Sequence, residues 1–488
     1  MNIADDLTEH AGRRPDHPAI VDDDRVMTYA TLASRVDRTA AHLRAAGIGE
    51  GSVVGVCLKD TAEHLVILYG LARLGAVILP MDWRWTTVEK CRVTSFFKAA
   101  LVVHEPGDDP SRAGATAVVD DAWHAAVAAA DGGQDFPSGR DLPLILSLSS
   151  GTTGIPKGPM ACHGHMIHRF GVYRSAFAFS EADRYLSALP LYFGGGRGMA
   201  MATLHFGGTV VMFPPPHDAA QLAAAVADKA ATVTLLVPTI LRRLLALAPR
   251  QEPVLGGLRL LVSTGAPLHA RERRAVMDRI CPNFVNFYGT TEAGGVTVLR
   301  PEDGGAAEHS VGRAVSGSTV EIVDEQDRPS PTGAVGYIRY RGRGVPAGFY
   351  KNPEASRAAF RDGWFYPGDL GRLDEAGYLY ITGRTSDRII RGGVNIYVAE
   401  IEQVLLDHAA VRDAAVVAWP SPERGEEIAA FVVATDAVEE ADILRHCKEI
   451  LAPYKVPRAI FLVDDLPKSG TGKVRKSDLI ARLPKLSD

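Results

Sequence analysis

The chain has 488 residues, which is too many for one hydrophobic core and predicts at least two domains. Hydrophobic residues make up 46% and charged residues 23%, as in soluble globular proteins, and the formal net charge of -5 argues against a nucleic-acid partner. The five cysteines include no Cys-x-x-Cys pair, and the acidic start of the chain lacks an apolar run, so we expect a cytoplasmic protein without a signal peptide.

Helical and extended patterns alternate along much of the chain. The first cycle is a helix over residues 31–46, a strand over 53–58, a helix over 62–74 and a strand over 76–79, and the second is a helix over 219–230, a strand over 233–237, a helix over 240–248 and a strand over 258–263. Such alternation predicts parallel sheets covered by helices.

One apolar stretch, residues 65–81, is the best candidate for a membrane span. Because it contains Arg73 and reaches Pro80 near its end, we interpret it as a buried helix followed by a strand. No transmembrane segment is therefore expected. Residues 108–139 are rich in Ala, Asp and Gly and are interpreted as a surface excursion.

The second half of the chain changes character. Residues 320–323 and 335–340 alternate between apolar and polar side chains around a turn at 327–333, which predicts antiparallel pairing in a small β subdomain. From Ser386 onward the chain is long enough for a compact α+β unit. We therefore predict an α/β fold with a large N-terminal domain of helix-covered, mostly parallel sheets plus a small β subdomain, and a small mobile α+β C-terminal domain.

The most informative segment follows the apolar run 142–148. It is made of hydroxyl side chains, glycines and one lysine: Ser149, Ser150, Gly151, Thr152, Thr153, Gly154, then Lys157 and a further glycine. Free backbone N–H groups, hydroxyl donors and a positive charge suit a polyphosphate, and glycine allows close approach of the backbone. No glycine stands immediately before Lys157, so the segment is not a Walker A loop.

Four further segments stand in a fixed order after this loop. They are Tyr288-Gly289-Thr290-Thr291-Glu292, then Gly363-Trp364-Phe365 with Gly368-Asp369, then Gly383-Arg384 through Glu400-Ile401-Glu402, and last Pro467-Lys468-Ser469-Gly470-Thr471-Gly472-Lys473. Together with the loop, they resemble the adenylate-forming superfamily over nearly the whole chain. That superfamily contains acyl- and aryl-CoA synthetases, carrier-protein-loading adenylation domains and firefly luciferase.

The resemblance implies an ATP site in the large domain. The loop from Ser150 would hold the β- and γ-phosphates, Thr291 would contact the α-phosphate, and Glu292 would ligate Mg²⁺, a role that suits a hard carboxylate. The remaining nucleotide contacts would come from Tyr288 stacked on adenine beside Gly289 and Thr290, from the adenine-side loop Gly265-Ala266-Pro267, and from Asp369 and Arg384 at the ribose.

The resemblance also assigns the C-terminal segments. Lys473 would lie between the attacking carboxylate and the α-phosphate, where a cation stabilises developing charge. Arg384 marks the end of the large domain, and Ser386 stands at the hinge, where the family usually has Asp or Lys. Gly392 and Gly393 would line the tunnel for the CoA thiol. We therefore expect domains over residues 1–385 and 386–488.

The expected acid pocket departs from the family pattern at one position. Phe193 stands where relatives often have His, which predicts an apolar wall or an aromatic gate. Gly194, Gly195 and Gly196 follow and are expected to leave unusual space. These residues favour a bulky or extended apolar acid.

The predicted function is ATP-dependent conversion of a carboxylic acid to acyl-AMP with release of pyrophosphate, followed by transfer to CoA. Transfer to phosphopantetheine on a separate carrier protein stays open, as does specialisation for one half-reaction. A non-catalytic nucleotide-binding module and a luciferase-like oxidation are alternatives of other classes. The acid and the oligomeric state are left open by the sequence.

Overall fold

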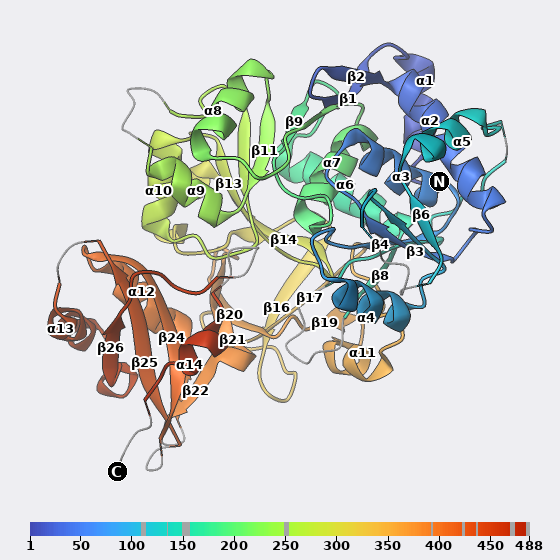
Figure 1. Ribbon diagram of the computed structural model, residues 1–488. Helices are drawn as coiled ribbons and strands as arrows, with labels where there is room; N and C mark the ends of the chain where they lie inside the picture. The colour runs from blue at the N-terminus through green and yellow to red at the C-terminus, as the bar shows by residue number, and fades with distance from the viewer. Residues whose placement is uncertain are drawn as a thin grey trace.

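The computed structural model describes residues 1–108, 114–133, 135–148, 157–247, 253–391, 394–421, 425–435, 438–468 and 474–484. Two large helix-covered sheets and the sheet of the β subdomain build the bulk of the molecule, and a fourth sheet belongs to the C-terminal part, which lies to one side in Figure 1. This confirms the predicted fold class.

The first large sheet has the strand order β6-β5-β3-β4-β7-β8. Its strands are β3 (Val53–Cys57), β4 (Val77–Pro80), β5 (Leu101–His104), β6 (Thr116–Val118), β7 (Pro143–Leu146) and β8 (Met160–Cys162). All neighbouring pairs are parallel except β7 with β8. The predicted phosphate loop begins after β7 and ends before β8.

The second large sheet has the order β15-β14-β13-β12-β11-β9-β10-β1-β2. Its strands are β1 (Pro18–Asp22), β2 (Arg25–Thr28), β9 (Arg184–Ser187), β10 (Thr209–Met212), β11 (Val233–Leu236), β12 (Leu260–Ser263), β13 (Phe284–Thr290), β14 (Gly294–Leu299) and β15 (Arg313–Ala314). The strands from β1 to β13 in this order pair in parallel, and antiparallel strands close both edges.

Helices alternate with these two sheets in layers. They are α1 (Asp5–Arg13), α2 (Tyr29–Ala45), α3 (Ala62–Arg73), α4 (Thr87–Phe97), α5 (Asp121–Ala129), α6 (His163–Phe177), α7 (Gly194–His205), α8 (Ala219–Asp228), α9 (Pro238–Leu245) and α10 (Ala270–Arg279). The largest core joins both sheets to α3, α6 and α7, while α8 to α10 share a core with the outer face of the second sheet and α4 with that of the first.

The stretch that could have crossed a membrane forms α3 and β4, as predicted. Every residue from His64 to Arg73 is buried in the protein core, because the helix lies between other elements on all sides. No helix in the described part of the chain combines the length and the apolar character that a membrane span needs.

The β subdomain and the C-terminal part follow in sequence. The subdomain contains β16 (Ser318–Val323), β17 (Gly336–Gly342), α11 (Pro353–Ala359), β18 (Phe360–Arg361), β19 (Trp364–Phe365), β20 (Asp369–Leu373) and β21 (Leu379–Arg384). The C-terminal part contains β22 (Arg388–Arg391), β23 (Val394–Tyr397), α12 (Val398–Asp407), β24 (Val411–Ser421), β25 (Gly425–Ala434), α13 (Glu440–Ile450), β26 (Ala459–Leu462) and α14 (Lys476–Ile480). The predicted antiparallel pairing of β16 with β17 is confirmed.

One interpretation was wrong. The stretch 108–139 is not only a surface excursion, because β6 extends the first sheet and α5 packs Trp123 and Val127 into the core. The Asp120 side chain accepts a hydrogen bond from the Trp123 backbone N–H at 2.9 Å and caps this helix.

Candidate active site

The candidate site lies where four adjacent parallel strands end. In β9, β11, β12 and β13 the chain runs in one direction, so the segments that follow these strands meet at one edge of the sheet. Phe193, Gly265 and Thr291 all lie in such segments. The carboxyl edge of a parallel sheet is the usual place for a ligand in α/β proteins.

Some predicted site residues lie outside the described residues. They are Ser149, Ser150, Gly151, Thr152, Thr153, Gly154, Gly392, Gly393 and Lys473. Their assigned roles stay predictions.

Asp369 is the best-held member of the predicted nucleotide site. Its side chain is almost fully buried at the start of β20, and its carboxylate faces two partners. The Tyr288 hydroxyl donates to Asp369 Oδ2 at 2.6 Å, and Arg384 Nε lies 3.0 Å from Asp369 Oδ1. The structure thus brings together three residues that are far apart in the sequence.

Tyr288 contributes a group that the sequence interpretation did not consider. Burial raises the pKa of its hydroxyl well above the usual value, and the Asp369 charge acts in the same direction. The phenol is therefore protonated at neutral pH and serves as a donor to Asp369. This bond fixes the carboxylate that is the predicted acceptor of the ribose hydroxyls.

The turn that carries Thr291 and Glu292 connects β13 to β14. The two strands are antiparallel with an irregular register between Tyr288 and Gly289. A β-carbon at Gly289 would lie 2.3 Å from the carbonyl oxygen of Gly294, so only glycine fits this close crossing. The Thr290 side chain accepts from the Ala293 backbone N–H at 3.2 Å and closes the turn.

Arg169 of α6 holds this turn by its main-chain carbonyls, and the sequence interpretation missed it. Its Nη2 donates to the Glu292 carbonyl at 2.5 Å and its Nη1 to the Thr291 carbonyl at 3.4 Å. Both Nε and Nη2 also donate to the Gly344 carbonyl, at 3.0 and 2.9 Å. Burial lowers the pKa of this guanidinium, which nevertheless remains a cation. It joins the predicted metal-binding turn to the segment after β17.

Glu292 fits the predicted Mg²⁺ role by its chemistry. Its side chain is mostly buried and its carboxylate has no hydrogen-bond or ion-pair partner within the described ranges. One carboxylate together with phosphate oxygens and water is a common ligand set for Mg²⁺. No group of three potential metal-ligating side chains occurs among the residues that the structure describes.

Phe193 connects the predicted acid pocket to the adenine-side loop. A β-carbon at Gly195 would lie 2.9 Å from Phe193 Cε1, and one at Gly265 would lie 3.8 Å from Phe193 Cζ. The aromatic ring therefore lies against both glycines. Gly265 has a φ of 95°, a conformation that favours glycine, and Ala266 and Pro267 follow it.

The expected space at the three glycines is largely absent. The Phe193 ring occupies it at Gly195, and at Gly196 a β-carbon would lie 2.9 Å from the carbonyl oxygens of Leu189 and Pro190. These two glycines serve close packing of α7 on the preceding loop. Only Gly194 leaves room, since its nearest neighbour would be Arg197 Nη2 at 3.9 Å.

Lys157 lies at the described end of the predicted phosphate loop. Its Nζ is 5.9 Å from the centre of the Phe349 ring, and the adjacent Gly158 carbonyl accepts from the Tyr350 N–H at 2.9 Å. Lys157 and Gly158 thus contact the segment between β17 and α11.

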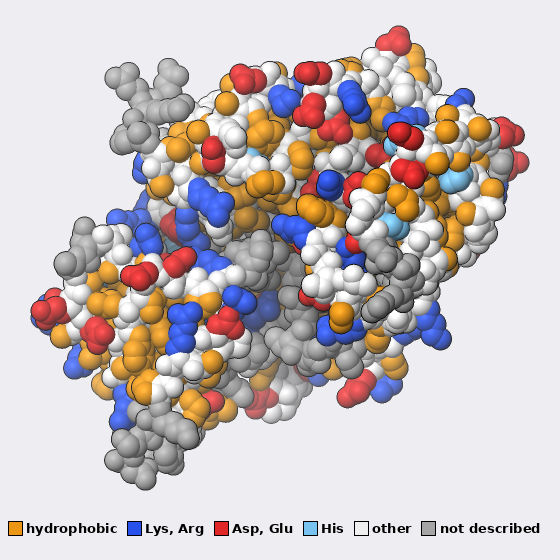
Figure 2. Space-filling view, in the orientation of Figure 1, with side chains coloured by type: hydrophobic (Ala, Val, Ile, Leu, Met, Phe, Trp, Pro, Cys, Tyr) orange, Lys and Arg blue, Asp and Glu red, His pale blue; other side chains and the backbone are white. Residues whose placement is uncertain are grey.

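Ser386 lies in the short 3-10 helix Thr385–Asp387 between β21 and β22, where the subdomain sheet ends and the C-terminal sheet begins. The C-terminal part also touches the residue before α10, since Gln403 Oε1 lies 3.0 Å from His269 Nδ1. In Figure 2, Lys and Arg side chains border the hollow between the C-terminal part and the rest of the molecule.

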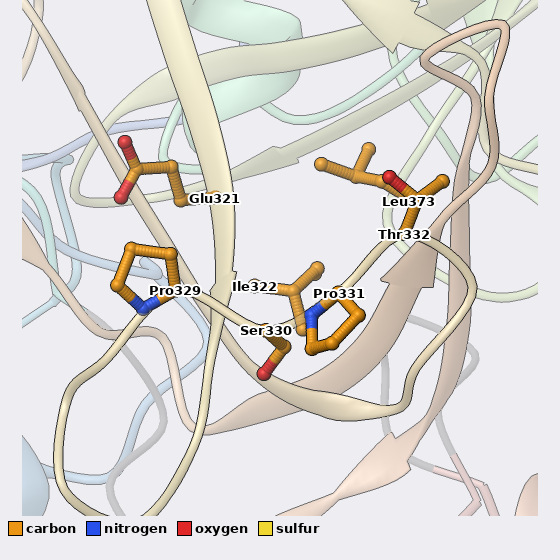
Figure 3. A pocket seen from close by; sticks show the side chains of 7 residues that line it. All are labelled: Glu321, Ile322, Pro329, Ser330, Pro331, Thr332 and Leu373. Atoms are coloured by element: carbon orange, nitrogen blue, oxygen red, sulfur yellow. The ribbon is translucent and has the colours of Figure 1, made fainter.

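A cavity of about 190 Å³ in the β subdomain is separate from these residues. Glu321 and Ile322 of β16, Leu373 of β20 and the loop 329–332 line it (Figure 3). None of the predicted site residues belongs to it, so it is not the candidate active site.

Comparison with known families agrees with this geometry. Residues 7–350 match the model of the AMP-binding enzyme family, and residues 400–473 match the AMP-binding enzyme C-terminal domain. The chain belongs to the AMP-binding enzyme family.

Individual relatives cover the chain almost from end to end. The indoleacetate–CoA ligase of Aromatoleum aromaticum is 32% identical, with 99% of each chain covered. The fatty acid–[acyl-carrier-protein] ligase ScoC of Streptomyces coeruleorubidus is 30% identical, over 96% of this chain and 94% of that protein. The crystal structure of ATP-bound MatB from Rhodopseudomonas palustris superposes with a TM-score of 0.91 at 30% identity, covering 99% of each chain.

Proposed function

We propose that this chain is an AMP-forming acid–CoA ligase. A carboxylate oxygen of the acid attacks the α-phosphorus of ATP, the bond between the α- and β-phosphates breaks, and pyrophosphate leaves. The CoA thiolate then attacks the acyl carbon, AMP leaves, and a thioester is formed. In-line transfer of this kind depends mainly on positioning and on neutralising phosphate charge.

The observation that carries the proposal is the joint placement of Tyr288, Asp369 and Arg384 beside the turn of Thr291 and Glu292. Asp369 offers acceptors for both ribose hydroxyls, and Arg384 balances its charge. Thr291 supplies a hydroxyl donor for the α-phosphate. Mg²⁺, held by Glu292 and phosphate oxygens, would neutralise charge on the triphosphate.

The C-terminal part completes the proposed site. We assign residues 1–385 to the ATP- and acid-binding domain and 386–488 to a domain that rotates about Ser386. Lys473 would act in adenylation, and Gly392 and Gly393 would admit the CoA arm in the second half-reaction. The position of the described 3-10 helix between two separate sheets supports this division.

We propose an apolar acid as the substrate. The Phe193 ring lies at the start of α7 against Gly195 and Gly265, and such a wall favours aromatic or alkyl groups over charged ones. The name of the indoleacetate–CoA ligase supports an aromatic acid and CoA as acceptor. The name of the carrier-protein ligase supports a separate carrier protein as the second candidate acceptor.

The test is pyrophosphate release across a panel of carboxylic acids, with ATP and Mg²⁺ and with or without CoA. We expect acid-dependent release for at least one aromatic or alkyl acid and a thioester mass when CoA is present. A thioester found only with phosphopantetheinylated carrier protein would favour the second acceptor. Acyl-AMP that accumulates with neither acceptor would indicate an enzyme of one half-reaction. No acid-dependent release from any member of the panel would contradict the proposal.

A further inference from the structure

Arg197 joins the predicted acid pocket to the start of the predicted phosphate loop. Its side chain rises from the first turns of α7 and is almost fully buried, with 3% of its surface exposed. Its Nη1 donates to the carbonyls of Leu191 and Tyr192, each at 2.9 Å, and its Nη2 donates to Ser147 Oγ at 2.9 Å. Leu191 and Tyr192 directly precede Phe193, and Ser147 stands two residues before Ser149.

The charge of Arg197 is not compensated by a carboxylate. No Asp or Glu oxygen lies within 4.0 Å of its guanidinium in the described part of the chain, and the same holds for Arg169. The titratable groups that face Arg197 are Arg169 and Tyr173 from α6 and His64 from α3. Burial, and next to it the Arg169 charge, lower the pKa of Arg197 to about 10.

The two neighbours that titrate do not offset this charge. Burial lowers the pKa of His64 to about 4 and raises that of Tyr173, so both side chains are neutral at pH 7. Two guanidinium cations without a neighbouring carboxylate in the described part of the chain therefore lie in this interior, Arg197 at Ser147 and the acid-pocket segment and Arg169 at the turn of residues 291 and 292. Burying an unpaired charge destabilises the folded protein. Proteins keep such unfavourable groups mainly at functional sites, and a cation of this kind suits a site that binds an anion.

From these contacts we infer that Arg197 is a positioning residue for ATP: it fixes Ser147, and with it the start of the phosphate loop, against the acid-pocket segment, and the nucleotide phosphates supply its missing counter-charge. The inference rests on the proposed function, since it needs ATP as the ligand of the loop. Arg197→Met would fill much of the space but remove the three hydrogen bonds and the charge.

Equilibrium binding of ATP, measured by calorimetry without any acid, tests this directly. We expect Arg197→Met to weaken ATP binding about tenfold or more at pH 7, while Arg197→Lys stays within about threefold of wild type. A buried lysine loses its proton more readily than arginine, so ATP binding should weaken more in the Arg197→Lys protein than in wild type as the pH rises from 7 to 9.

Two further variants separate this role from a loss of packing. Ser147→Ala removes only the Nη2 bond and should weaken ATP binding about threefold without changing the buried charge. Arg273 is another buried arginine, on α10, whose Nη1 donates to the Arg300 carbonyl at 3.4 Å. Arg273→Met should lower the melting temperature and leave the ATP affinity unchanged.

The outcomes distinguish the inference from the proposed function. Wild-type protein that binds no ATP would overturn both. Wild-type affinity in a folded Arg197→Met protein, or in Ser147→Ala when Arg197→Met does not fold, would overturn the Arg197 inference alone. A ratio of Arg197→Lys to wild-type affinity that stays constant with pH would overturn the role of the charge.

Discussion

Asp369 and Arg384 lie directly opposite each other in the β20–β21 pair, and Arg384 Nε approaches Asp369 Oδ1 at 3.0 Å. The carboxylate is buried while the arginine is about half exposed, with 54% of its side chain accessible. Within the described residues, the accessible part of the pair is therefore on the arginine side. This arrangement fits a carboxylate that accepts hydrogen bonds from two hydroxyls of a nucleoside while its ion pair with Arg384 stays intact.

Replacing Asp369 with asparagine should impair nucleotide binding. Asn keeps the shape but offers one acceptor in place of two, so we expect the KM for ATP to rise about 10- to 100-fold, in line with lost hydrogen bonds to a charged group. Steady-state kinetics with saturating acid measures it. Asp362→Asn, on an exposed turn of the same subdomain, is the control. An unchanged KM for ATP in Asp369→Asn would exclude the ribose role.

Replacing Arg169 should damage both stability and catalysis. Arg169→Met leaves the carbonyls of Thr291, Glu292 and Gly344 without their donor, which should lower the free energy of unfolding by about 2–4 kcal/mol. Displacement of the turn should lower kcat/KM about 100-fold. Denaturant unfolding and kinetics measure the two effects. Arg174→Met, on the exposed side of α6, should show neither effect. Full activity in a folded Arg169→Met protein would disprove the link.

Asp60 should make stability depend on pH. Its buried carboxylate accepts from the Leu191 N–H at 2.6 Å, and burial raises its pKa from 3.8 to about 6. A raised pKa favours the protonated folded form, so this stability is present below about pH 4 and is lost as the pH rises through 6.

The Asp60→Asn protein resembles the protonated form at every pH. The free energy of unfolding of Asp60→Asn relative to that of wild type should therefore increase by up to about 3 kcal/mol as the pH rises from 4 to 7. Chemical denaturation at a series of pH values measures this difference. The exposed Asp16→Asn serves as control, and a difference for Asp60→Asn that does not change with pH would refute the burial argument.

Phe193 should determine which acids are accepted. Phe193→Ala removes the ring that lies against Gly195 and Gly265 and so enlarges the proposed pocket. We expect the ratio of kcat/KM for larger over smaller apolar acids to rise at least tenfold, while the KM for ATP stays within about threefold. Phe206→Ala, at the other end of α7, removes a similar ring outside the site. An equal change in acid preference for both variants would argue against a pocket at Phe193.

Lys473 should be needed for the first half-reaction. With an acid identified by the panel, we expect Lys473→Ala to slow ATP–pyrophosphate exchange about 100-fold or more, as for loss of one preorganised electrostatic group. Lys468→Ala is the comparison, because Lys468 Nζ is paired with Asp413 Oδ2 at 2.6 Å. That variant should lose stability and retain exchange. Normal exchange in Lys473→Ala would refute the assignment.

Regular elements of the fold were predictable because their signals are local. The apolar pattern over 62–74 gave α3, and the alternation over 320–323 and 335–340 gave the β16–β17 pair. The helix α5 was missed because the Gly and Asp residues on either side of it give the whole stretch 108–139 the composition of a loop. Asp120 stands immediately before this helix, and aspartate is a preferred N-cap residue, so this signal was available in the sequence.

The site was predictable only where a residue has a recognisable motif. Asp369 stands in such a motif, but its bond to the Tyr288 hydroxyl spans 81 positions and has no local sign. Arg169 and Arg197 occur in ordinary helical sequence, and their partners are backbone carbonyls and one serine hydroxyl. A backbone acceptor leaves no trace in residue type, so sequence alone does not reveal these contacts.

Arg169 grips the turn at residues 291 and 292 through main-chain oxygens alone. The backbone at these two positions is thereby held independently of the side chains of Thr291 and Glu292 themselves. Substitution of Thr291 or Glu292 should therefore leave the backbone of the turn in its native geometry. Such variants are suitable for crystallisation trials with ATP and a candidate acid.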